Sequence, residues 1–187
     1  NGEDGSRKTT TNSAAANKTI IGSIEPKVQG GLTNYVSWKF IDFNLTLTYS
    51  LGGHAYDYAT WLQSNGGTYH YLGNVPAYYK MEDTWQKTGD NAKLPQFAYG
   101  NANKASSRWL MSTDHLRVKN MTLGFTLPQS WSSKAGISKL RAYVSGNNLL
   151  TWKKKSLYVD PEVPVDGLCT FETPALRTVT FGLEIGF

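Results

Sequence analysis

The sequence predicts an all-β fold made of antiparallel transmembrane β-barrel strands. Three observations favour it: long stretches alternate between apolar and polar residues, no uninterrupted apolar run exceeds three residues, and short connections alternate with long ones. A membrane-spanning helix needs about 20 apolar residues in a row. A barrel strand needs only about 10 residues that are apolar at alternate positions, so a mean hydropathy of −0.42 is compatible with a barrel.

The first two strands are expected at 32–40 and 43–51. Alternation is strictest in the second, where one parity holds Phe43, Leu45, Leu47, Tyr49 and Leu51 and the other parity is polar. Such alternation indicates a strand with one apolar and one polar face. In the first strand Val36, Trp38 and Phe40 share a face, and Tyr35 breaks the pattern. Because only a short turn at 40–42 separates the two stretches, they form a hairpin.

Three further strands are expected at 116–127, 140–145 and 178–187. In the first of these the apolar parity changes near Asn120, which predicts a β-bulge. The last one alternates apolar residues with Thr, Gly and Glu184, and its apolar parity holds Val179, Phe181, Leu183, Ile185 and Phe187. The sequence therefore predicts five strands, which are too few to close a barrel by themselves.

The connections between these strands predict a membrane topology. Residues 1–30 read as a loop or connector, and 31–187 as the barrel part, with a helical turn expected at 129–135. The connections are, in order, short at 40–42, long at 53–113, short at 128–138 and long at 151–174. Outer-membrane barrels have short periplasmic turns and long external loops. The two long connections are therefore expected outside the cell, and the last strand is expected to end in the periplasm.

The apolar parity is expected to face lipid, because polar side chains are costly in hydrocarbon. Aromatic residues near the strand ends fit interface girdles, and they are Trp38, Phe40, Tyr49, Phe125, Trp131 and Phe187. A soluble β-sandwich has the same alternation with its apolar parity toward a core, so periodicity alone leaves it open. A long loop at 53–113 fits poorly into a compact sandwich, which favours the barrel.

Composition argues against several other classes. The net charge is +5, but the basic residues are scattered and Lys153–Lys155 is their only tight cluster, so nucleic acid is not an expected partner. The histidines at 54, 70 and 115 lack metal-site spacing, and Cys169 is the single cysteine, so no metal or cofactor is expected. No catalytic motif is recognisable, and a loop with Asp57, Glu82, Asp83 and Asp90 is explained by solvation as well as by catalysis. The chain is not expected to be an enzyme.

Several motifs resemble the SusC/RagA family of TonB-linked outer-membrane receptors. They occur in the order expected for late barrel strands: Pro26-Lys27-Val28-Gln29-Gly30-Gly31-Leu32-Thr33-Asn34, then the stretch from Leu116 to Pro128 (LRVKNMTLGFTLP), then Leu140 to Thr151 (LRAYVSGNNLLT), and Asp160-Pro161-Glu162. The resemblance covers about 20–187. It implies the C-terminal strands of a barrel of about 22 strands, of which the chain is a fragment or a processed piece.

The resemblance also implies a function and partners. Such receptors import glycans or oligopeptides across the outer membrane of Bacteroidota. They work with a SusD-type surface lipoprotein and with TonB. They also have an N-terminal plug and further barrel strands, and membrane lipid surrounds the barrel. A soluble carbohydrate-binding β-sandwich module is the main alternative, and a structural barrel without transport is another.

Two sets of candidate site residues follow. Sugars dock on aromatic faces, and loops carry function, so the ring-rich loop suggests ligand contacts at Trp61, Tyr69, Tyr71 and Trp85; packing of the loop against itself is the favoured explanation for each ring. At the other end, Gly182, Ile185 and Phe187 resemble the C-terminal signal read by the outer-membrane insertion machinery. Recognition of an edge strand by backbone pairing is its physical basis. The simpler alternative is that Phe187 only faces lipid.

Overall fold

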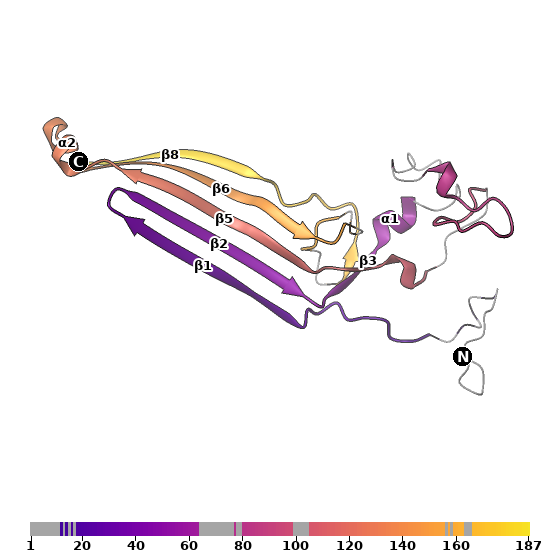
Figure 1. Cartoon of the computed structure of the whole chain (residues 1–187). Coiled ribbons are helices and arrows are strands. Elements are labelled where there is room, and N and C mark those ends of the chain that lie inside the picture. The colour runs from indigo at the N-terminus through magenta and orange to yellow at the C-terminus, as the bar shows by residue number, and fades with distance from the viewer. Residues whose placement is uncertain are drawn as a thin grey trace.

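The computed structural model describes residues 12, 14, 16, 18–63, 77, 80–98, 105–155, 157, 159–162 and 166–187. Its main element is a sheet of five long strands in the order β1-β2-β5-β6-β8, with every neighbouring pair antiparallel. The strands are β1 (Val28–Trp38), β2 (Ile41–Leu51), β5 (His115–Thr126), β6 (Lys139–Lys153) and β8 (Thr178–Gly186). Figure 1 shows them as one long, curved band. The predicted all-β antiparallel fold is confirmed.

The first hairpin turns at Lys39–Phe40, slightly earlier than the 40–42 expected from the sequence. Trp38 pairs with Ile41, and Lys39 adopts a left-handed φ of 54°, which a tight turn between twisted strands requires. Phe40 therefore leaves the strand and packs edge-on against Phe125, with ring centroids 6.5 Å apart. Pairing of β1 with β2 then continues without interruption to Val28 opposite Leu51.

The predicted bulge is present in β5. Thr46 pairs with Asn120 but Leu47 pairs with Val118, so Lys119 is an extra residue relative to β2. On β6, Asn148 and Leu149 have no partner in the register that joins β5 to β6. Asn148 has a left-handed φ of 52°. Asn tolerates this left-handed conformation better than most residues. The bulge explains why the apolar parity of β5 changes along its length.

The sheet has two chemically different faces. Residues directly opposite one another in a ladder point to the same face, so the registers place Leu32, Leu47, Phe43, Leu123 and Phe181 on one face and most of the Thr, Asn and Ser residues on the other. Asn34, opposite Leu45, lies on the apolar face. The apolar face is uncovered: Leu32 is 62% exposed, and Phe181 is 81% exposed. Tyr35 lies on the polar face opposite Asn44, which is why it breaks the apolar pattern.

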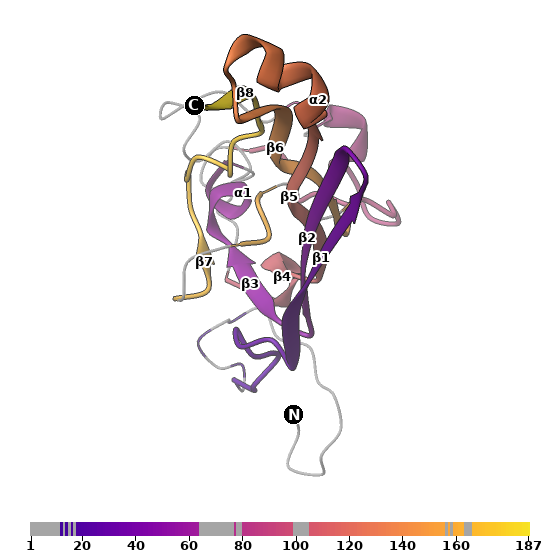
Figure 2. The same ribbon diagram turned by 90° about the vertical axis from the view of Figure 1, so that its left-hand side faces the viewer.

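The connections at the two ends of the sheet differ. At one end, β5 and β6 are joined by α2 (Gln129–Ser132) and η4 (Ser133–Ala135), so the predicted helical turn is confirmed. At the other end the long connections contain β3 (His54–Asp57), α1 (Tyr58–Gln63), η2 (Met81–Asp83), η3 (Ser107–Trp109), β4 (Leu110–Ser112) and β7 (Leu168–Cys169). Figure 2, seen from the α2 end, shows the small elements gathered beyond the long strands.

A second, small sheet organises the loop end. Its strand order is β4-β3-β7, with β3 antiparallel to β4 and parallel to β7. The buried apolar residues of this end are Ala55, Ala59, Trp109, Leu157 and Cys169, so the loops have a core of their own. Burial raises the pKa of the Cys169 thiol to about 12, which marks it as a packed, unreactive cysteine. No helix among the described residues is long and apolar enough to cross a membrane.

Candidate functional site

The polar face of the sheet carries rows of hydrogen-bonded side chains across the strands. The Thr33 and Thr46 hydroxyls lie 3.3 Å apart on β1 and β2. Asn120 on β5 donates to Asn147 Oδ1 on β6 at 2.8 Å, and Asn147 donates to the Thr178 hydroxyl on β8 at 3.2 Å. The register places Thr46 on β2 directly opposite Asn120 on β5, so these residues form one polar surface across the strands, as the wall of a watery lumen needs.

A buried arginine ties the second long connection to this polar surface. The Arg117 side chain on β5 is only 2% exposed, and it donates to Asp160 Oδ1 at 2.5 Å and to Glu162 Oε2 at 3.0 Å. Lys119, the bulge residue, adds contacts of 3.0 Å to both oxygens of Glu162. The Asp160 carboxylate also accepts the backbone N–H groups of Glu162 and Ala175. The loop is therefore held against the sheet by charge-assisted hydrogen bonds.

The pKa of Asp160 records this arrangement. Burial alone raises it, but the N–H of Glu162, the Arg117 guanidinium and the N–H of Ala175 together bring it below its ordinary value. Asp114, where the first long connection returns to β5, is similar: its pKa is lowered by the N–H of Gly52, 2.5 Å away, and by the Ser112 hydroxyl. An ionised carboxylate therefore joins the second loop to the sheet at neutral pH, and another joins the two ends of the first loop.

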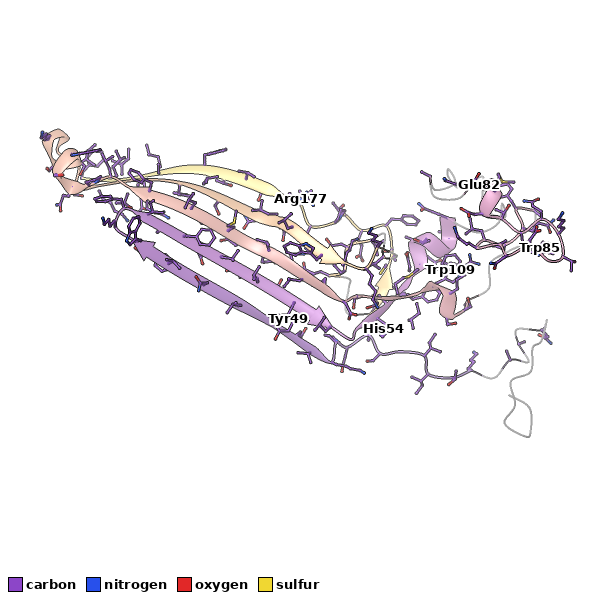
Figure 3. The ribbon with its side chains drawn as sticks, viewed as in Figure 1. Tyr49, His54, Glu82, Trp85, Trp109 and Arg177 are labelled. Atoms are coloured by element: carbon purple, nitrogen blue, oxygen red, sulfur yellow. The ribbon has the colours of Figure 1, made fainter. Side chains whose placement is uncertain are left out.

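An open cleft of about 730 Å³ lies where the two loops meet the sheet. Its walls come from the segment before β1, from the loop ends of β1, β2 and β5, and from both long connections; the polar residues among them are Glu25, Gln29, Thr48, Ser50, His54, Thr113, His115 and Glu162. Figure 3 shows His54 just past the end of β2, beyond Tyr49. None of these residues was predicted as a ligand contact, because the cleft unites segments far apart in the sequence.

A second charge cluster lies on the polar face at the turn end. Arg141 on β6 binds both carboxylate oxygens of Asp42 on β2, at 2.9 and 2.6 Å, although β5 lies between these strands. The bridge passes over Gly124 of β5, where a Cβ would overlap with the Asp42 and Arg141 side chains. Arg141 also approaches Glu184, which pairs with Lys139 at 2.7 Å. A missing side chain on the middle strand therefore allows an ion pair to span three strands.

The C-terminal residues Gly182, Ile185 and Phe187 lie in or just after β8. Gly182 pairs with Tyr143, and a Cβ there would overlap with the Tyr143 ring, so this glycine makes room for an aromatic side chain on the polar face. Ile185 lies opposite Leu140. Phe187 is 93% exposed. The structure thus gives Gly182 a packing role in addition to the predicted signal.

Two of the four predicted loop aromatics, Trp61 and Trp85, lie in the described part of the chain. Trp61 lies on α1, tilted against Tyr58 with centroids 5.1 Å apart, and its buried indole nitrogen has no hydrogen-bond partner among the described residues. Trp85 is 38% exposed and lies with Glu82 at the outer end of the loops (Figure 3). Tyr69 and Tyr71 lie outside the described residues.

The loop carboxylates make local contacts. Asp57 is fully buried and accepts the N–H of Thr60 at 2.9 Å, at the start of α1. Asp83 pairs with Lys93 at 3.1 Å, and Asp90 accepts the N–H groups of Gln86 and Lys87. These contacts account for the positions of three of the four carboxylates considered in the sequence.

Comparisons with known proteins agree with this architecture. No family model matches the chain. It is 30% identical, over 93% of its length, to a curated protein of Formosa agariphila named TonB-dependent receptor P3, of which it spans 18%. A second relative from the same organism, TonB-dependent receptor P26, is 25% identical over 90% of the chain, and the chain again spans 18% of it.

Solved structures give the same result. The RagAB peptide importer in the closed-closed state matches 96% of the chain with a TM-score of 0.80 and 25% identity, and the chain spans 19% of the matched protein. The RagAB peptide transporter matches 90% of the chain with a TM-score of 0.76 and 25% identity, and 18% of that protein is spanned. The chain therefore spans less than a fifth of the length of the proteins that it matches.

Proposed function

Since the chain carries barrel strands of a TonB-linked receptor of the SusC/RagA type, we propose that the complete protein imports an oligopeptide or glycan nutrient across the outer membrane. The observation that supports this most is the division of the sheet into a continuous polar face and an uncovered apolar face. One face then lines the transport lumen and the other contacts lipid. The related RagAB structures are of a peptide importer, which favours an oligopeptide.

The uncovered apolar face argues against a soluble β-sandwich. A sandwich covers the apolar side of each sheet with a second sheet about 10 Å away. Here Leu123 is 49% exposed and Leu183 is 61% exposed, and the small sheet lies beyond the strand ends rather than over this face (Figures 1 and 2). Lipid is the environment that accommodates such a surface. A structural barrel without transport is separated from an importer by the uptake experiment.

The partners in this proposal follow from the family. The long connections face the exterior and contact a SusD-type surface lipoprotein or the ligand, while TonB acts through the plug domain of the complete receptor. The firm attachment of the loop by Arg117 to Asp160 and Glu162 supports this, because a recognition surface needs a defined shape.

Energy-dependent uptake tests the proposal. Cells that express the complete receptor are expected to accumulate labelled oligopeptides or glycans, and a protonophore or deletion of TonB should abolish the accumulation. Replacing Trp85, a candidate ring that is 38% exposed, by Ala should weaken uptake, with the barrel still assembled. Trp109→Phe, at a buried position, is a control for loop packing. Uptake that persists without TonB would contradict the proposal.

We also propose that the last strand is an assembly signal with Gly182, Ile185 and Phe187 as its specific positions. Phe181 on β8 provides a matched control, because it is an exposed phenylalanine too, 81% exposed against 93% for Phe187, which directly follows the strand. Phe187→Ala should reduce the amount of receptor in the outer membrane and leave precursor in the periplasm, whereas Phe181→Ala should not. Equal outer-membrane levels for both variants, measured by fractionation and immunoblotting, would show that Phe187 only faces lipid.

A further inference from the structure

The cleft at the loop end of the sheet contains polar atoms whose hydrogen-bonding capacity is unused. His54 Nδ1 and Thr48 Oγ1 are both buried and have no partner among the described residues, and both residues line the cleft. A buried polar atom without a partner is destabilising and calls for an explanation, such as a ligand or an ordered water. Two of them in one cleft mark it as a place where a polar group is received.

The tautomer of His115 adds an acceptor. His115 is only 9% exposed, and its Nδ1 lies 2.8 Å from the carbonyl oxygen of Thr113. A carbonyl oxygen can only accept, so Nδ1 carries the proton, and Nε2 of the neutral ring is an acceptor. The other polar groups of the cleft include the Glu25 carboxylate and the hydroxyls of Ser50 and Thr113.

The charges of the cleft favour a cation. Its lining contains Glu25 and Glu162 but neither Lys nor Arg, as far as the structure describes it. Glu162 is neutralised by Arg117 and Lys119, whereas Glu25 makes no ion pair with any described residue. One uncompensated carboxylate among acceptors attracts an ammonium group and repels a carboxylate or phosphate.

The cleft is held in shape by its surroundings. The segment before β1 is fixed by the His54 N–H, which donates to Ser23 O at 2.9 Å, and by the Lys27 N–H, which donates to Leu51 O at 2.9 Å. The Ile24 side chain covers Gly167 of the second loop so closely that a Cβ there would overlap with it. Binding to a preformed cleft loses less conformational entropy than binding to a mobile one.

We propose that this cleft is a ligand subsite that takes a primary ammonium group, such as the amino terminus of a peptide, with Glu25 as its counter-ion and the Thr48 hydroxyl, His54 and His115 as its hydrogen-bonding partners. The inference rests on the proposed import function and specifies the substrate as a peptide with a free amino group. A neutral glycan lacks the charge that Glu25 selects.

The complete receptor, purified in detergent, tests this with a pool of random octapeptides made with free or acetylated amino termini. The free pool should bind at least about tenfold more tightly, as expected for a charge-assisted hydrogen bond. Glu25→Gln should remove most of that difference. Glu172→Gln, which changes a carboxylate in the second loop outside the cleft lining, should leave it intact.

Thr48→Val distinguishes ligand binding from an unused hydroxyl. If the hydroxyl binds the ligand, the variant weakens binding of the free pool; if it only remains unpaired, the variant melts at the same or a higher temperature and binds normally, which overturns its role. Equal binding of the two pools, binding of neither pool, or an unchanged ratio in Glu25→Gln would overturn the subsite. TonB-dependent uptake by the same variants would then show that the import function still stands.

Discussion

Two arginines on the polar face of the sheet form similar ion pairs but connect different parts of the molecule. Arg141 lies near the turns, and Arg117 lies near the loops. Arg141 joins strands: it reaches Asp42 across an intervening strand and is 20% exposed. Arg117 joins a strand to a loop and is 2% exposed, with Asp160 and Glu162 as its partners. The first pair depends on the register of three strands, and the second on the conformation of one loop.

The contrast shows why the two ends respond differently to change. At the turn end the backbone ladders already fix the positions of Asp42 and Arg141, so loss of the ion pair leaves the strands in place. At the loop end few backbone hydrogen bonds tie the second loop to the sheet, and the carboxylates of Asp160 and Glu162 connect them. A salt bridge therefore matters most where it replaces, rather than supplements, a backbone ladder.

The largest effect is expected from Arg117→Met. The change leaves two carboxylates without their buried partner, so the free energy of local opening of the second loop should fall by about 2–4 kcal/mol. Hydrogen exchange at the N–H groups of Glu162 and Ala175, both bonded to Asp160, measures it. Lys119→Met removes an exposed partner and should cost less than about 1 kcal/mol; equal losses in the two variants would refute the distinction.

The second prediction concerns Gly124 at the turn end. Gly124→Ala places a methyl group where the Asp42–Arg141 ion pair passes over β5, and the overlap should lower the free energy of unfolding by about 1–3 kcal/mol. Thermal melting of the receptor in detergent measures it. In an Arg141→Met background the same change should cost much less, since the obstacle is gone. An undiminished loss in that background would show that the glycine serves the backbone instead.

A third, smaller effect is the response of the loop end to acid. The pKa of Asp160 is lowered in the folded chain. The ionised carboxylate therefore stabilises the loop fully at pH values above the ordinary pKa of 3.8, and this stabilisation is lost as pH falls through the lower pKa of the folded chain. Exchange protection at Ala175, corrected for the intrinsic rate, should therefore be constant from pH 7 to 5 and decline only below about 3.8. Asp160→Asn should remove this decline, and a midpoint near pH 6 would contradict the assignment.

The smallest effect is expected for Lys139→Met. Lys139 and Glu184 are each about half exposed, so their 2.7 Å contact is screened by water and salt. Its removal should lower the melting temperature little or not at all, and raising the salt concentration should hide any difference. A loss as large as that of Gly124→Ala would show that the turn-end network acts as a unit.

The long strands could be predicted because their information is local. Each confirmed feature reflects local contacts with a fixed backbone period: the alternation at 43–51 and 178–187, the parity change near Asn120 and the helical turn after Pro128. The small sheet of β3, β4 and β7 was not predicted, because its strands are two to four residues long and lie far apart in the sequence. Such short segments show no period.

The loop-end contacts illustrate the same limit. The motifs that contain Arg117 and Asp160-Pro161-Glu162 stood out in the sequence, but their pairing over 43 and 45 residues follows only from the path of the loop. An arginine at an inward position of a barrel strand was the available signal, since a buried guanidinium requires carboxylates. His54 and Thr48 gave no signal, because an unused hydrogen-bonding atom is a property of the folded chain.

The extra residue in β5 has a consequence for how such receptors can exchange parts. The side chains that point to the polar face have one parity before Lys119, as in Arg117, and the opposite parity after it, as in Asn120. A β5 strand assembled from two receptors must therefore keep its bulge. A chimera joined at this point with one residue too few would turn Arg117 from the lumen toward hydrocarbon. An external loop with a new specificity is therefore best transferred together with the loop-end half of β5, with the junction after Asn120.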